Sequence, residues 1–224
     1  MREINEAGER PGIKLIFVRL VFVLLGLAAW FGTQNLLATR PFPEGVVGDG
    51  IFDITAPLND FLNAHPTAAD ALLVVSSLVI DLVSAYILFW AIIGPSIRPF
   101  LGLLILFGLR QFCQALCALP APEHMIWRYP GFPSALVTYG TASDLFFSGH
   151  TALAVYGALE LSRRQGVAWK YLGVLIAVFE ASTVLVLRAH YTMDVFTGIL
   201  AAIWVNSFID RVTIPVDRAL QKLV

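Results

Sequence analysis

Two short stretches of this chain combine residue types that could carry out phosphoryl chemistry. In the first, Ser148, Gly149 and His150 follow one another at the expected start of a helix. A serine hydroxyl, an approachable glycine N–H and the positive end of a helix dipole together make a niche that suits a phosphate. His150 adds a ring that can exchange protons, so this stretch predicts a phosphate site with an acid–base group beside it.

The second stretch contains His190, with Asp194 four positions later and Arg188 two positions earlier. On a helix, a spacing of four places His190 and Asp194 on one face. Two histidines, an aspartate and an arginine can supply a nucleophile, a group that orients it, an acid and a charge clamp. We therefore predict His150, His190 and Asp194 as the catalytic residues.

The composition of the chain indicates a membrane protein. Of its 224 residues, 58% are hydrophobic and only 14% are charged, far from the average of soluble proteins. A formal net charge of −1 and the lack of a basic tract argue against a nucleic-acid partner. Cys113 and Cys117 lack the spacing and the matched histidines of a zinc site, so we expect them to pack in the core.

Hydropathy predicts an all-α, polytopic membrane protein with six transmembrane helices in one bundle, forming a single domain over residues 1–224. Each apolar run has roughly the 17–25 residues that are needed to cross a hydrocarbon core of about 30 Å. The first run is too long for a signal peptide and lacks a convincing cleavage site after it, so we expect it to be retained. The six runs are residues 13–37, 71–93, 97–119, 144–161, 169–187 and 191–209.

The lysines and arginines are divided unequally between the two sides of the predicted bundle. With both termini on one side, that side carries ten of the 15, against three on the other side and two within the spans. The positive-inside rule then places the termini in the cytoplasm. Both histidine stretches accordingly face the periplasm, the lumen or the exterior.

Two longer segments join the predicted spans on the outer side. The apolar spacing of residues 52–62 could make a short helix that lies on the outer surface, or a loop packed over the bundle. The segment 119–143 contains Trp127 and Tyr129 among prolines. Such aromatics are typical of interfacial anchors, but they could instead form a wall that holds a quaternary ammonium head group.

Four ionisable residues fall at similar depth in four of the predicted spans: Asp81, Arg110, His150 and Glu180. Ionisable groups in a span are costly, so they are candidates for function. Their common depth suggests a polar pocket that opens to the outer leaflet, with Arg110 as a phosphate ligand or as the partner of Asp81 or Glu180. The alternative is a buried ion pair that only fixes the register of the helices.

The two histidine stretches resemble the second and third motifs of the type 2 phosphatidic acid phosphatase superfamily: Phe-Ser-Gly-His-Thr at 147–151 and His-Tyr-Thr-Met-Asp at 190–194. More narrowly, the chain is similar to the branch of sphingomyelin synthases, inositol phosphorylceramide synthases and plant phosphatidylcholine:diacylglycerol cholinephosphotransferases. The likeness runs from about residue 57 to residue 198 and includes Arg98, Arg110 and the Leu-Pro-Ala-Pro of residues 119–122. Asp144 corresponds to an aspartate that sphingomyelin synthases carry, although Ala-Ser precedes it here instead of Cys-Gly.

This resemblance implies a role for each residue. His190, held by Asp194, would attack the phosphorus and form a phosphohistidine, while His150 would protonate the leaving lipid alcohol and deprotonate the incoming one. No metal or other cofactor is required. Phosphoryl charge would be taken up by Arg110, Ser148, Gly149 and Arg188, and the remaining residues expected at the substrate pocket are Asp81, Trp127, Tyr129, Asp144 and Glu180.

The branch transfers a phospho-head-group from one lipid to the hydroxyl of another. We therefore expect an integral-membrane phosphotransferase with a phosphatidylcholine or phosphatidylethanolamine donor and a diacylglycerol or ceramide acceptor. The alternative is a lipid phosphate phosphatase acting on phosphatidic acid or a related monoester, because the outcome depends on whether water or a lipid hydroxyl enters the site. A silent binding or transport protein would be expected to lack one of the three catalytic residues, and all three are present.

Overall fold

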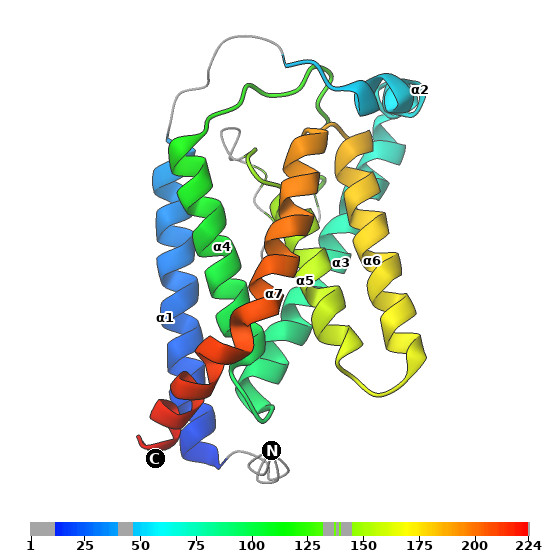
Figure 1. Ribbon diagram of the computed structural model, residues 1–224. Helices are drawn as coiled ribbons and strands as arrows, with labels where there is room; N and C mark the ends of the chain where they lie inside the picture. The colour runs from blue at the N-terminus through cyan, green and yellow to red at the C-terminus, as the bar shows by residue number, and fades with distance from the viewer. Residues whose placement is uncertain (1–11, 40–46, 132–136, 138, 140–144, 224) are drawn as a thin grey trace.

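The computed structural model describes residues 12–39, 47–131, 137, 139 and 145–223. These residues form seven α-helices and no β-strand, so the all-α prediction is confirmed for the described part of the chain (Figure 1). The helices are α1 (Ile13–Ala38), α2 (Gly50–Ala64), α3 (Pro66–Ile93), α4 (Arg98–Leu116), α5 (Gly149–Ser162), α6 (Val167–Val186) and α7 (Thr192–Gln221).

Five of the described helices, α1, α3, α4, α6 and α7, are long and apolar enough to cross a membrane. The predicted sixth span is not confirmed. Its helix, α5, has only 14 residues, or about 21 Å at 1.5 Å per residue, which is less than the hydrocarbon core of about 30 Å. The helix is short because Ser148 caps it at a point where residues 145–148 are not helical.

The short helix α5 is nevertheless the centre of the bundle. It contacts α3, α4, α6 and α7, and α6 packs most closely against it (Figure 1). A Cβ atom on Gly173 of α6 would lie 2.9 Å from the Cα atom of Ala158, so only glycine permits this approach. Similarly, a Cβ atom on Gly198 of α7 would lie 2.9 Å from the carbonyl oxygen of Ser148. The first contact fixes the later part of α5 against α6, and the second fixes its start against α7.

The helix α2 lies across one end of the bundle, over α3 and α6 (Figure 1). Asp49 caps it by accepting a hydrogen bond from the backbone N–H of Ile51 at 3.0 Å. Of the two alternatives for residues 52–62, the helix is therefore correct and the loop is wrong.

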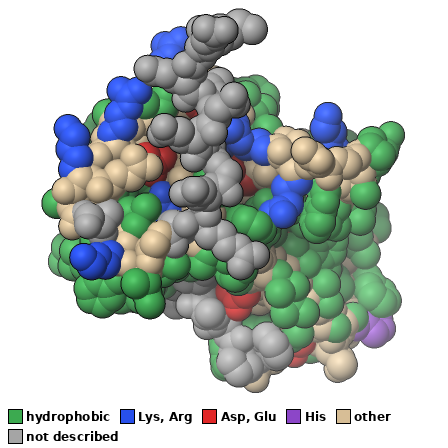
Figure 2. Space-filling model, turned by 90° about the horizontal axis from the view of Figure 1, so that it is seen from below, with side chains coloured by type: hydrophobic (Ala, Val, Ile, Leu, Met, Phe, Trp, Pro, Cys, Tyr) green, Lys and Arg blue, Asp and Glu red, His purple; other side chains and the backbone are tan. Residues whose placement is uncertain are grey.

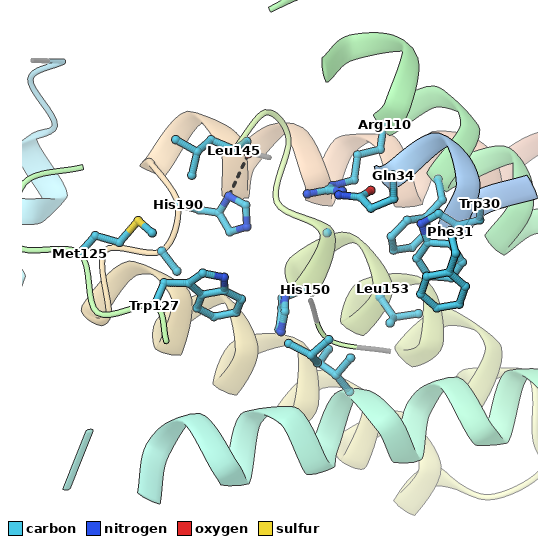
Figure 3. Close-up of a pocket in the computed structure, with 15 residues that line it drawn as sticks. Trp30, Phe31, Gln34, Arg110, Met125, Trp127, Leu145, His150, Leu153 and His190 are labelled. Carbon is cyan, nitrogen blue, oxygen red and sulfur yellow. Dashed lines mark hydrogen bonds between the residues drawn. The ribbon is translucent and has the colours of Figure 1, made fainter. Parts of the chain in front are cut away.

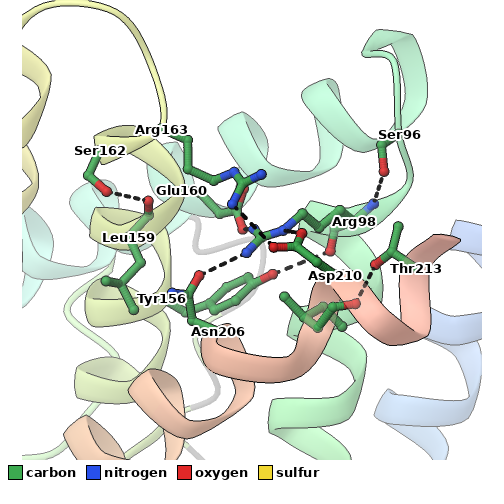
Figure 4. A network of polar contacts seen from close by, with 11 residues as sticks. Ser96, Arg98, Tyr156, Leu159, Glu160, Ser162, Arg163, Asn206, Asp210 and Thr213 are labelled. Carbon is green, nitrogen blue, oxygen red and sulfur yellow. Dashed lines mark hydrogen bonds and ion pairs between the residues drawn. The ribbon is translucent and has the colours of Figure 1, made fainter. Parts of the chain in front are cut away.

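The opposite end of the bundle carries both termini, and Lys and Arg side chains gather on it (Figures 1 and 2). Here α7 continues twelve residues past the predicted end of its span, to Gln221. A polar network joins α4, α5 and α7 at this end (Figure 4). In it the guanidinium of Arg98 contacts the carboxylates of Glu160 and Asp210 and the amide oxygen of Asn206.

Candidate active site

A cavity of about 60 Å³ lies among the last turns of α1 and α4 and the first turn of α5, and Figure 3 shows the residues that line it. Arg110 of α4, Gly149 and His150 of α5, and His190 just before α7 all line it. By the same measure a water molecule needs roughly 10–15 Å³. The cavity therefore has room for a phosphoryl group, but not for a whole lipid.

His190 is oriented by a backbone carbonyl. Its Nδ1 atom lies 2.9 Å from the carbonyl oxygen of Leu145, and a carbonyl oxygen can only accept, so Nδ1 carries the proton. In the neutral ring the other nitrogen, Nε2, then holds the lone pair. Because the ring lines the cavity with Nδ1 tied back to Leu145, that lone pair is available to a group bound there (Figure 3).

Asp194 lies near this ring, but not on the same helical face as His190, which is what the spacing of four predicted. His190 precedes α7 by two residues, so the two side chains do not share a helical face. The Oδ2 atom of Asp194 accepts the backbone N–H of Tyr191 at 2.9 Å, as part of the cap of α7, and lies 3.6 Å from Nδ1 of His190. This distance exceeds that of a hydrogen bond, so the carboxylate acts on the ring mainly through its charge.

Ser148 is fully buried and caps α5 instead of lining the cavity. Its hydroxyl oxygen accepts the N–H of Thr151 at 3.3 Å, and its proton is donated to the Thr151 hydroxyl at 3.0 Å. The first N–H groups of a helix have no partner within the helix, and those of Gly149 and His150 stand at the end that faces the cavity. The backbone of this stretch, and not its hydroxyl, is thus placed to receive an anion.

Arg110 is buried, and its side chain reaches the cavity across Gly149. Its Nε atom donates to the carbonyl oxygen of Phe147 at 2.7 Å, which fixes the guanidinium. A Cβ atom on Gly149 would lie 3.0 Å from Nε of Arg110, closer than most neighbours of a real Cβ. A larger residue in place of Gly149 would therefore press on the arginine.

Of the two aromatic residues expected at the pocket, Trp127 lines the cavity and Tyr129 does not. The ring of Trp127 stands edge-on to that of His150, with ring centroids 5.2 Å apart. It also contacts Tyr139, whose hydroxyl meets that of Ser77. Burial raises the pKa of Tyr139, so this phenol stays protonated. The exposed fraction of Tyr129 is 57%, which suits an interfacial position.

The wall of the cavity opposite Trp127 comes from α1 and was missed by the sequence analysis. Trp30, Phe31 and Gln34 line the cavity, and Gln34 points toward Arg110 (Figure 3). A buried glutamine near the end of a predicted span was a signal that could have identified this face, because a polar side chain is rarely left in lipid.

Three other predicted pocket residues are placed outside the cavity. Arg188 has a positive φ of 52°, and its guanidinium donates to the carbonyl oxygens of Glu123 and Phe52. Glu180 is fully buried and accepts a hydrogen bond of 2.7 Å from Ser76 of α3. Asp81 is half-buried on α3, one residue beyond Ile80, which does line the cavity.

Consequently, the four ionisable residues that the sequence placed at one depth do not share one pocket. Arg110 and His150 line the cavity, whereas Glu180 faces α3 through its bond to Ser76. Asp144, which was also expected at the pocket, lies outside the described residues.

Comparison with known proteins identifies the family. A family model described as AtPDCT1/2 matches residues 48–211, well over half of the chain. The chain belongs to the AtPDCT1/2 family. The match contains every predicted catalytic residue, while α1 and its cavity wall precede it. It agrees with the narrower of the two resemblances, and membership of the wider phosphatase superfamily stays a prediction.

Two curated relatives of this AtPDCT1/2 family chain come from Arabidopsis thaliana. Phosphatidylcholine:diacylglycerol cholinephosphotransferase 1 is 26% identical over 187 residues, covering 81% of this chain and 59% of the relative. Phosphatidylcholine:diacylglycerol cholinephosphotransferase 2 is 25% identical over 171 residues, covering 76% and 54%. The chain thus spans little more than half the length of these relatives. No solved structure matches it.

Proposed function

We propose that this protein is an integral-membrane lipid phosphotransferase. It moves a phospho-head-group of the phosphocholine or phosphoethanolamine type from a glycerophospholipid to the hydroxyl of diacylglycerol or ceramide. The observation that carries the proposal is the tautomer of His190, whose Nε2 lone pair is held toward a cavity that also contains Arg110 and the start of α5. Family membership and the names of the two relatives support the same class of reaction.

In the proposed mechanism, Nε2 of His190 attacks the phosphorus, and the bond from phosphorus to the diacylglycerol oxygen breaks. His150 donates a proton to that oxygen, so diacylglycerol leaves as a neutral alcohol. In the second step His150 takes the proton of the acceptor hydroxyl, whose oxygen attacks the phosphohistidine and releases His190. The Nε2 atom of His150 has no hydrogen-bond partner among the described residues, as a group that exchanges protons with a substrate requires.

The charge of the cavity favours a phosphodiester donor. Arg110 is the only lysine or arginine among the described residues that lines the cavity, since Arg188 is turned toward α2. A phosphodiester carries one negative charge, whereas a monoester carries nearly two and is best held by several cations. Trp127 and Trp30 line the cavity, and a choline or ethanolamine cation bound there would contact these aromatic rings.

The test uses purified protein with labelled phosphatidylcholine, phosphatidylethanolamine or phosphatidic acid, each with and without diacylglycerol or ceramide. We expect an acceptor-dependent lipid product from at least one diester, and EDTA should not inhibit its formation. Release of free phosphate from phosphatidic acid, with no acceptor-dependent product from either diester, would replace the transferase with a phosphatase. Inhibition by EDTA that a divalent ion reverses would contradict the metal-free mechanism.

We also propose that the termini face the cytoplasm and the cavity faces the other side of the membrane. The supporting observations are the gathering of Lys and Arg at the terminal end (Figure 2) and the position of the cavity at the last turns of α1 and α4, toward the opposite end. Cysteines placed at the exposed positions Tyr129 and Gln165 provide the test. An impermeant thiol reagent added outside intact cells should label Tyr129→Cys and not Gln165→Cys, and the reverse pattern would invert the topology.

A further inference from the structure

An apolar groove runs between α1 and α4 and continues the cavity. Its volume is about 110 Å³, and Trp30 and Phe107 line both spaces. The two rings lie against each other at the junction, with centroids 4.3 Å apart. The polar residues of the groove, Thr33 and Gln111, are at the end next to the cavity, while the rest of its lining is apolar.

The groove follows α4 over a length that suits an acyl chain. Its α4 wall extends from Phe100 to Gln111, which is about 16 Å along a helix. This is about half of a hydrocarbon core of 30 Å, or the depth of one leaflet. The cavity lies at the end that Gln111 marks, so a lipid with its phosphate at Arg110 would direct its chain along the groove.

The space is open where a chain would lie. A Cβ atom on Gly108 would meet no atom within 4 Å, although this glycine lines the groove. By contrast, a Cβ atom on Gly26, at the far end, would lie 2.7 Å from the ring of Phe100. The two helices are thus closely packed at Gly26 and leave open space at Gly108, toward the end of the groove that is next to the cavity.

We propose that this groove binds an acyl chain of the lipid whose phosphoryl group occupies the cavity, with Trp30 and Phe107 at the boundary between head group and chain. The cavity is too small for a whole lipid, so its chains must lie elsewhere, and the groove is the apolar space that continues from it. The inference rests on the proposed function for the phosphate in the cavity. It assigns a substrate-binding role to α1, which the family match does not reach.

The first test measures binding without turnover. Purified protein in nanodiscs is irradiated with phosphatidylcholine that carries a diazirine in one acyl chain, and the labelled peptides are mapped. We expect labelling of α1 and α4 at the groove that unlabelled phosphatidylcholine competes away. Uniform labelling of all lipid-facing helices, without competition, would show only bulk lipid in the groove and would overturn the proposal.

Gly108→Phe adds a ring at a position that lines the groove and where a Cβ atom meets nothing within 4 Å, and Gly32→Phe is its matched control. Gly32 is an exposed glycine of α1 that lines neither space, and its Cβ would also meet nothing within 4 Å. Gly108→Phe should lower the competable labelling by about tenfold, the effect of 1.4 kcal/mol in binding, and Gly32→Phe should leave it unchanged. Equal labelling of the two variants would overturn the proposal.

The second test separates the groove from the reaction. Gly108→Phe should lose transfer from long-chain phosphatidylcholine but keep transfer from the dihexanoyl lipid, which also shows that the variant is folded. Full activity of Gly108→Phe on the long-chain donor would contradict the groove assignment. If wild-type protein transfers nothing from any lipid, yet the competable labelling of α1 and α4 persists, the proposed function fails while the chain-binding groove stands.

Discussion

The two ends of α4 carry buried arginines in opposite settings. Arg98, at the end of the bundle near the termini, is enclosed by the carboxylates of Glu160 and Asp210 and the amide of Asn206 (Figure 4). Arg110, about 18 Å further along the helix, lines an open cavity and is aimed by a backbone carbonyl, that of Phe147. Arg98 thus belongs to a structural network, whereas Arg110 lines the cavity.

This comparison shows two ways in which the fold orients a buried polar side chain. At the terminal end, the guanidinium of Arg98 is held by carboxylate and amide groups of the protein. At the cavity, the carbonyl oxygen of Phe147 accepts a hydrogen bond from Nε of Arg110, and that of Leu145 accepts one from Nδ1 of His190. A carbonyl can therefore fix the direction of a side chain without forming an ion pair with it.

The largest expected effect is that of His190→Asn, which should lower transfer by about 10⁴-fold or more, the scale seen when a nucleophile is removed. Thermal unfolding in detergent should be little changed, because the ring borders a cavity. The matched control is His65→Asn, at an exposed histidine before α3, which should retain full activity. Near-normal turnover of His190→Asn on every lipid offered would exclude it as the nucleophile.

Arg98→Met should lower the stability of the fold and leave the turnover of the folded protein unchanged. It leaves the buried carboxylate of Glu160 without its guanidinium, and breaking a buried pair in this way costs about 3–5 kcal/mol. The measurement is thermal unfolding, with transfer rates taken per folded molecule. Arg98→Met combined with Glu160→Leu should recover much of the loss, because no unpaired buried charge is left. A stable Arg98→Met protein with little turnover would show that the terminal network takes part in the reaction.

Asp194→Asn should have a smaller effect than loss of His190. At 3.6 Å, the attraction between carboxylate and imidazolium is worth at most about 5 kcal/mol at an effective dielectric of 20. We expect a decrease in transfer of about 10²–10³-fold, because Leu145 still holds the ring and asparagine can still accept the Tyr191 N–H. A loss as large as that of His190→Asn would mean that the carboxylate, and not the carbonyl, sets the tautomer.

Ser148→Ala should have the smallest effect. It removes the cap of α5 and should lower stability by about 1 kcal/mol, whereas Ser148→Gly, which is tolerated at this position, should cost only about a few tenths. Turnover should change little in both, because the hydroxyl faces Thr151. A large drop in turnover with unchanged stability would instead identify the hydroxyl as a phosphate ligand.

The sequence predicted well what depends on local apolar runs. The spans at 13–37 and 169–187 agree closely with α1 and α6, because a lipid-facing helix must be apolar along its whole length. The span at 144–161 is not confirmed, because α5 begins only at Gly149 and has 14 residues. The spacing of four between His190 and Asp194 predicted that both lie on one helix. This was wrong, because α7 begins only at Thr192 and His190 precedes it.

The sequence by itself determined that this is an all-helical membrane chain, and it marked two short stretches as the residues with chemistry to do. Only the tertiary structure decided which neighbours complete the cavity. Trp30 and Gln34 line the cavity although α1 is far from the two motifs in the sequence. Arg188 and Glu180 instead form hydrogen bonds with residues of α2 and α3. Residue type and spacing along one segment fix a side chain's chemistry and its local direction, but its contacts depend on helix packing between segments distant in sequence, which no local pattern records.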